Sequence, residues 1–204
     1  MSFASRRGAS PPLAPVSTHT HTVLSRCGRP DVTLPAIMDL AAARGFGLIA
    51  VTDHVHVPAY TDYPAHLTRL ADYKAWRAAA VPAVPLVIGG EFEVLSPGRM
   101  VDDPALVAAC ECVLVATNHY QLPWIEPPPA ALAAAAAHEL DCLQTALDWP
   151  PTQVVAHPFF NGTTAHSTDA LFAACDHRRL DELIDCAVAR GVAFEIQPQF
   201  RGEP

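Results

Sequence analysis

Histidine and acidic residues recur along the sequence in positions that could hold metal ions. His19 and His21 are separated by one residue, and side chains two apart in an extended segment point to the same side. Both imidazoles could therefore bind one ion. Four more candidate ligands follow at wide intervals: His54, Glu91, His119 and His157. Imidazole combined with carboxylate suits Zn²⁺, Mn²⁺ or Fe²⁺.

One of the acidic residues could bridge two ions, because a carboxylate has two oxygens whereas a neutral imidazole cannot bridge. Glu91 and Glu93 are both placed for this role. The alternation of side chains along a strand puts them on the same face, so alternation alone does not choose between them.

The elements that would position these side chains form an α/β pattern. Short apolar runs alternate with helical patterns, which predicts β/α units around a mostly parallel sheet or barrel. Strands are expected over 14–18, 47–52, 85–94, 112–117, 153–156 and 192–196. Helices are expected over 33–44, 65–80, 104–110, 129–147 and 179–190. Thr33 is placed to cap the first helix and Gly45 to end it.

Each expected strand carries a candidate ligand or runs directly into one. In a barrel of parallel strands the carboxyl ends converge on one face, where active sites form. A single histidine at a strand end commonly has a structural role. Six strands with the same feature favour one shared metal site instead. In chain order these residues are His19 and His21, Asp53 and His54, Glu91 and Glu93, His119, His157, and Glu195.

Composition excludes several classes of protein. The net charge is −8, and the 13 Lys and Arg residues form no basic run, which argues against nucleic acid as the main partner. The six cysteines form no CxxC pair, as expected of reduced thiols in the cytoplasm. No segment resembles a secretory signal or a membrane span. Residues 1–14 are expected to be a flexible tail before a single domain over 15–204.

Five segments carry the candidate ligands in a characteristic order. They are THTHTVLSRCG at 18–28, AVTDHVH at 50–56, GGEFEV at 89–94, TNHYQ at 117–121 and VVAHPF at 154–159. In this order they resemble the PHP family, the polymerase and histidinol phosphatase group of metallohydrolases. The resemblance implies a distorted (β/α)₇ TIM-like barrel that binds two or three divalent ions, Zn, Mn or Fe. It also implies hydrolysis of a small phosphorylated metabolite through a metal-bound hydroxide.

The resemblance also implies roles for the ligands. One ion would be held by His19, His21 and Glu91. A second would be held by His119 and His157, with Glu91 bridging the two ions. His54 resembles a ligand of a third ion. Asp53 resembles a residue that supports the ligands without binding a metal itself.

The chain departs from the family pattern at two places. Cys27 stands where some members have a further histidine; we expect it to be a buried packing residue, and metal binding through its thiolate is the alternative. Family members usually end with a strand that carries an aspartate and a histidine two residues apart. The sequence stops before such a strand, so the barrel is expected to lack its last strand and to be C-terminally incomplete. Glu93, Glu195 or Glu203 could replace the missing aspartate.

Arginines that follow the strands are candidates for binding phosphate, because guanidinium pairs with phosphate bidentately. They are Arg26, Arg29, Arg99 and Arg201, with ordinary exposed loop arginines as the alternative. Two other functions stay open. One is an amidohydrolase-like enzyme, which shares the HxH motif and cleaves C–N or C–O bonds. The other is a degenerate, non-catalytic metal-binding PHP domain.

Overall fold

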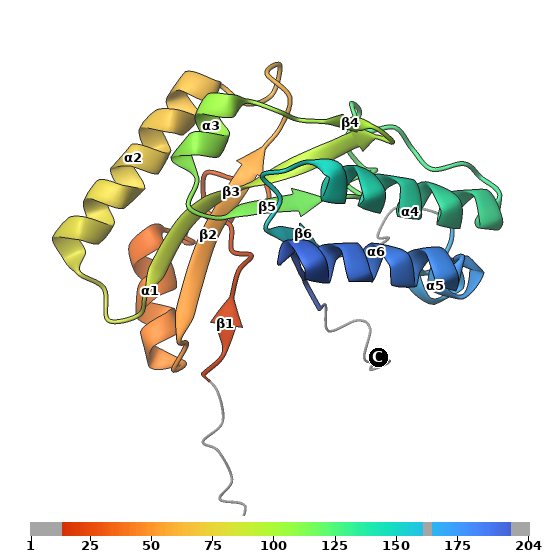
Figure 1. Cartoon of the computed structure of the whole chain (residues 1–204). Coiled ribbons are helices and arrows are strands. Elements are labelled where there is room, and N and C mark those ends of the chain that lie inside the picture. The colour runs from red at the N-terminus through yellow and green to blue at the C-terminus, as the bar shows by residue number, and fades with distance from the viewer. Residues whose placement is uncertain (1–13, 161–164, 197–204) are drawn as a thin grey trace, which may run out of the picture.

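A curled, mostly parallel sheet forms the centre of the computed structural model, which describes residues 14–160 and 165–196 (Figure 1). The sheet curls through half a barrel. The structure therefore confirms the predicted α/β class. The half-barrel is compatible with a TIM-like barrel that lacks a strand. Its parallel strands lie in the order β1 (Val16–Ser17), β2 (Leu48–Val55), β3 (Leu86–Ser96), β5 (Val113–Ala116), β6 (Val154–Ala156) and β7 (Ala193–Phe194).

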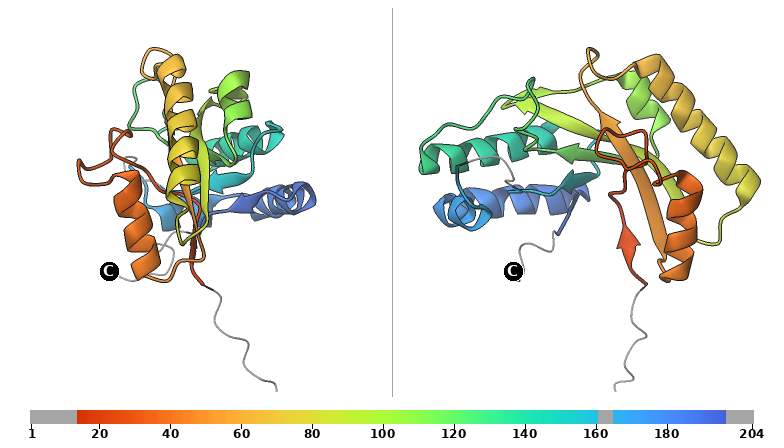
Figure 2. Two further views of the ribbon diagram at one scale, coloured as in Figure 1. Left: turned by 90° about the vertical axis from the view of Figure 1, so that its left-hand side faces the viewer. Right: turned by 180° about the vertical axis from the view of Figure 1, so that it is seen from behind.

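Helices connect these strands, as parallel pairing requires. Within the described ranges they are α1 (Leu34–Ala43), α2 (Tyr63–Ala80), α3 (Pro104–Ala109), α4 (Leu132–Asp148), α5 (Thr168–Ala174) and α6 (His177–Arg190). Figures 1 and 2 show α1 to α3 beside one half of the sheet and α4 to α6 beside the other. None of these helices is long and apolar enough to cross a membrane. The predicted tail, apart from Ala14, lies outside the described residues.

Local capping chemistry sets the helix boundaries. Thr33 caps α1 as predicted, because its Oγ1 accepts a hydrogen bond from the Ala36 N–H. Gly45 follows α1 with φ of 68°, a conformation that favours glycine. Helix α2 begins two residues earlier than predicted because Asp62 caps it. Helix α4 begins only at Leu132, after the prolines at 127–129, which lack the N–H that a helix interior requires.

The structure corrects the boundaries of the strands near the candidate site. Strand β2 extends to Val55, so Asp53 and His54 lie within the strand rather than after it. Strands β2 and β3 pair in a register that puts His54 directly beside Glu91. Two elements were not predicted: α5 and the short strand β4 (Arg99–Met100), which pairs antiparallel with β3 after a turn at Gly98.

The side chains of strand β3 alternate between the hydrophobic core on one face of the sheet and the candidate site on the other. Ile88, Phe92 and Val94 belong to the core cluster that packs with the helices. The residues between them, including Glu91 and Glu93, therefore point to the opposite face of the sheet. Strand β3 thus carries two fully buried carboxylates on one face and core side chains on the other.

Candidate metal centre

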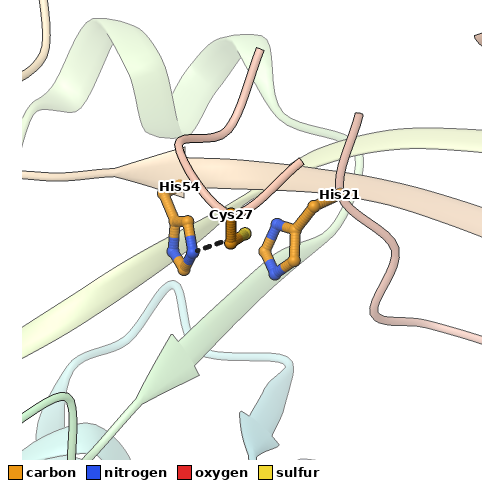
Figure 3. Close-up of side chains that lie close together, drawn as sticks. All are labelled: His21, Cys27 and His54. Carbon is orange, nitrogen blue, oxygen red and sulfur yellow. Dashed lines mark hydrogen bonds between the residues drawn. The ribbon is translucent and has the colours of Figure 1, made fainter. Parts of the chain in front are cut away.

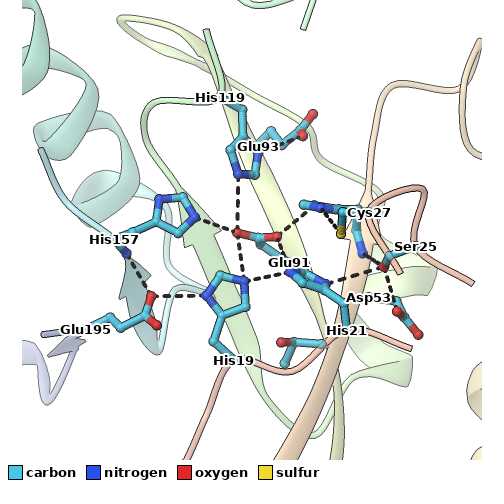
Figure 4. Close-up of polar contacts among 12 residues, drawn as sticks. His19, His21, Ser25, Cys27, Asp53, Glu91, Glu93, His119, His157 and Glu195 are labelled. Carbon is cyan, nitrogen blue, oxygen red and sulfur yellow. Dashed lines mark hydrogen bonds and ion pairs between the residues drawn. The ribbon is translucent and has the colours of Figure 1, made fainter. Parts of the chain in front are cut away.

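The buried carboxylate of Glu91 lies among imidazoles from four segments that are far apart in the sequence (Figure 4). Its Oε1 lies 3.1 Å from Nε2 of His157 and 3.3 Å from Nε2 of His19. The same oxygen lies 3.6 Å from Nε2 of His119. The structure therefore brings together the residues that the sequence analysis grouped around Glu91.

The other oxygen of Glu91 faces two further imidazoles. Oε2 lies 2.7 Å from Nδ1 of His54 and 3.5 Å from Nε2 of His21. Glu91 Oε2 and His54 Nδ1 are both buried, and neither makes a hydrogen bond of acceptable geometry. Buried polar atoms without partners cost free energy, and a cation that accepts electron pairs from both atoms would remove that cost. The residues present therefore fit a divalent ion.

Three sets of side chains place their ligand atoms within 4.8 Å of one another, close enough to hold an ion. These sets are His19 with Glu91 and His157, His54 with Glu93 and His119, and His21 with Cys27 and His54. Each set combines imidazole with a carboxylate or a thiolate, as is common for Zn²⁺. All six residues predicted as primary ligands fall in at least one set.

Cys27 is not the buried packing residue that was expected, because its side chain is exposed. Figure 3 shows it between His21 and His54, and its Sγ lies 3.5 Å from Nε2 of His54. Partial burial of the thiol raises its pKa. A bound cation would favour the thiolate instead, so the position of Cys27 fits the alternative of a metal ligand.

The carboxylate of Glu93 makes hydrogen bonds with two imidazoles and one indole. In His119 the bond is to the nitrogen that points away from Glu91. Its Oε1 lies 3.1 Å from Nδ1 of His119 and 2.7 Å from Nδ1 of His56, and its Oε2 accepts from the Trp124 indole N–H. A hydrogen bond at Nδ1 of His119 leaves Nε2 free to face Glu91. Such outer carboxylates fix the tautomer and orientation of metal-binding histidines.

Asn118, which was not predicted, and Glu195, which was a candidate from the sequence, hold His157 in place. Asn118 Oδ1 lies 3.0 Å from Nδ1 of His157, and Asn118 Nδ2 donates to the His157 carbonyl. Glu195 Oε2 accepts from the His157 backbone N–H and lies 3.0 Å from Nδ1 of His19. The backbone of His157 has φ of 31°, and such conformations persist where the surroundings hold them in place. The sequence signal for Asn118 was its place beside His119.

Asp53 fixes the loop that carries His21, which agrees with its predicted supporting role. Its carboxylate accepts hydrogen bonds from the Thr22 backbone N–H, the Thr22 hydroxyl and the Ser25 hydroxyl. Ser25 Oγ also lies 3.3 Å from Nδ1 of His21 and accepts from the His54 backbone N–H. One buried carboxylate thus anchors two candidate ligands through Ser25.

Charge is concentrated in this buried cluster. Burial disfavours protonation of His19, but hydrogen bonds with Glu195 and Glu91 outweigh it and raise the His19 pKa to about 10. Burial lowers the pKa of His21 to about 4. Burial also opposes the charge on Glu91, yet the surrounding imidazoles hold its pKa well below the usual range. A divalent ion would compete with the protons of the cluster, so its binding would strengthen as pH rises.

The candidate phosphate-binding arginines have different surroundings. Arg29 is paired with Asp31 in an exposed loop, 2.6 Å between Nη2 and Oδ2, and so is already engaged. Arg99 is exposed in β4. Arg26 lies beside the cluster, with its guanidinium carbon 5.5 Å from the centre of the Tyr60 ring. Arg201 and Glu203 lie outside the described residues.

The chain matches no protein-family model and no curated protein sequence. Its function is therefore inferred from the residues and geometry of the site.

Proposed function

We propose that this chain is a metal-dependent phosphoesterase of the PHP type that hydrolyses a small phosphorylated metabolite. The observation that carries the proposal is the set of imidazoles from His19, His21, His54, His119 and His157 around the buried Glu91 carboxylate. Histidines mixed with a shared carboxylate are a common donor set of hydrolytic metal sites. In this proposal the half-barrel is part of a distorted (β/α)₇ barrel.

The chain's own residues would hold the ions in two main groups. By the family resemblance, His19, His21 and Glu91 would bind one ion, and Glu91 would share the second with His119 and His157. The ligand atoms within 4.8 Å of one another instead group His157 with His19 and Glu91. A third position would combine His54 with Cys27. Bound Zn²⁺, Mn²⁺ or Fe²⁺ would offset charge on the phosphoryl oxygens and lower the pKa of a coordinated water.

The surrounding residues prepare the site without contacting the phosphoryl group. Glu93 and Asn118 hold the far nitrogens of His119 and His157, so the Nε2 atoms of these rings face Glu91. Glu195 does the same for His19. Because the rings are held before substrate arrives, less reorganisation is needed during the reaction. The six free cysteines fit a reducing compartment such as the cytoplasm.

Hydrolysis of p-nitrophenyl phosphate with added Mn²⁺ or Zn²⁺ tests this proposal. We expect His119→Ala to lower kcat/KM by roughly 100-fold or more, as loss of a group that binds the metal should. The matched control is His177→Ala, which removes an exposed histidine at the start of α6.

Equal activity of wild type and His119→Ala would contradict the proposal. Turnover of amides or lactones without turnover of phosphoesters would favour the amidohydrolase-like alternative. Bound metal with no turnover over a broad phosphoester panel would favour the non-catalytic alternative.

A further inference from the structure

A cavity of about 260 Å³ lies beside the imidazole cluster, between α2 and the loop after β1. His54 belongs both to the wall of this cavity and to the cluster around Glu91. A molecule held at the cluster could therefore extend into the cavity. The volume suits part of a small ligand rather than a polymer.

Three side chains that line this cavity carry nitrogen donors with no hydrogen-bond or ion-pair partner among the described residues. His66 and Arg69 stand one turn apart on α2, and Arg26 comes from the loop after β1. Neither guanidinium forms an ion pair or hydrogen bond with any residue in the described ranges. His66 is only 3% exposed, and its ring makes no hydrogen bond to a described residue.

The carboxylates of the same wall are already engaged by other groups. Asp53 accepts three hydrogen bonds from Thr22 and Ser25. Asp62 caps α2 by accepting from the Ala65 N–H. The two arginines and His66 are therefore available to donate to an anionic ligand in the cavity.

We propose that this cavity is a subsite for a second anionic group, a carboxylate or a second phosphate, on the leaving part of the phosphoester. The inference rests on the proposed phosphoesterase function, because the cluster around Glu91 would hold the phosphoryl group that is hydrolysed. Guanidinium groups bind carboxylate and phosphate with paired N–H donors, and a neutral imidazole can add one more. Tyr60 and Leu70 supply apolar surface for the carbon skeleton between the two anions.

Matched substrates that differ in one anionic group test the subsite. One pair is 3-phosphoglycerate and glycerol 3-phosphate; the other is fructose 1,6-bisphosphate and fructose 6-phosphate. We expect wild type to prefer the doubly anionic member of at least one pair by about tenfold to 100-fold in kcat/KM. The pair with the larger ratio identifies which anion the subsite binds.

Arg69→Gln should reduce this preference about tenfold and leave hydrolysis of p-nitrophenyl phosphate unchanged. Arg26→Gln should also reduce the preference about tenfold. Arg44→Gln is the matched control, because it removes an exposed arginine at the end of α1. Circular dichroism checks that each variant is folded. A wild-type preference that survives in both variants, or the absence of any preference, would overturn the proposal.

A binding measurement separates failure of the subsite from failure of the phosphoesterase proposal. Calorimetry with succinate and inorganic phosphate on EDTA-treated protein should show binding that Arg69→Gln weakens about tenfold. If no phosphoester is hydrolysed and this binding is present, the anion subsite is supported and the phosphoesterase proposal fails. If neither anion binds, or if Arg69→Gln binds as wild type does, the subsite proposal is wrong.

Discussion

Around Glu91, most imidazoles have a hydrogen-bond partner on the nitrogen that points away from the carboxylate. Glu195 serves His19, Glu93 serves His119, and Asn118 serves His157. Such partners set which nitrogen keeps its electron pair, and they add to the metal affinity of the ring. At the scale of single residues, the cluster is therefore organised as a set of oriented donors around one shared anion.

Glu93→Gln tests this orientation directly. Glu93 accepts from His56 and His119 on Oε1 and from the Trp124 indole N–H on Oε2, and an amide, which has one acceptor oxygen, cannot serve all three. The NH2 group would face a donor, so the hydrogen bond that fixes the His119 ring should be lost or weakened. We expect metal affinity, measured by competition with a chromophoric chelator, to fall about tenfold to 100-fold. Glu126→Gln removes an exposed carboxylate and should leave the affinity unchanged. Wild-type affinity in Glu93→Gln would show that Glu93 does not position the ring.

At the scale of elements, α4 carries a buried carboxylate with no ion-pair partner in the described part of the chain. Glu139 is 2% exposed, and burial raises its pKa to about 7, although the neighbouring Tyr120 and Asn118 oppose the shift. Cys142 and Cys175 are the other titratable groups that interact with it. The folded chain therefore keeps a proton on Glu139 at pH values where the unfolded chain has lost it.

This difference predicts how stability changes with pH. A raised pKa in the folded state stabilises the fold below the ordinary value of 4.5, and this contribution is lost as pH rises towards about 7. The loss amounts to about 3 kcal/mol. Glu139→Gln should flatten this part of the profile, measured by urea unfolding from pH 4.5 to 8. Glu182→Gln, an exposed change on α6, should keep the wild-type profile. Parallel profiles for wild type and Glu139→Gln would refute the prediction.

The sequence was most informative where elements are long and capped. The Thr33 cap predicted α1, and the apolar run at 47–52 predicted β2. In both places the intrinsic preference of the residues agrees with their burial in the fold. Strand β4 is only two residues long and α5 only seven, so neither has a periodic pattern to recognise. Because the carboxyl ends of parallel strands meet on one face, the sequence predicted that the histidines at the strand ends would gather around Glu91. It could not predict Asn118 or Trp124, whose roles depend on hydrogen bonds between distant elements.

At the scale of the whole molecule, the curled sheet brings ligands from β2, β3 and three loops to one place. A metal ion that binds only this assembled arrangement would stabilise the folded chain by mass action. It would also stabilise it more at higher pH, because the ion competes with protons for the imidazoles. Metal binding and folding should therefore be coupled.

Thermal unfolding measures this coupling. At a free Mn²⁺ or Zn²⁺ concentration 100 times the Kd, the folded chain should gain about 2.7 kcal/mol. We expect a higher Tm with metal, a lower Tm after EDTA, and a smaller metal effect in a His19→Ala, His157→Ala double variant. A Tm that is insensitive to metal and chelator in wild type would contradict the coupling.

The shared carboxylate is the centre of the proposed site, and its effect on metal content is the most direct test. Wild type and Glu91→Gln are purified without chelator and analysed by inductively coupled plasma mass spectrometry, with circular dichroism to confirm folding. A dinuclear site bridged by Glu91 predicts about two ions per wild-type chain and fewer than about one in the variant. Fewer than about one ion per wild-type chain, or equal content in the two proteins, would contradict it.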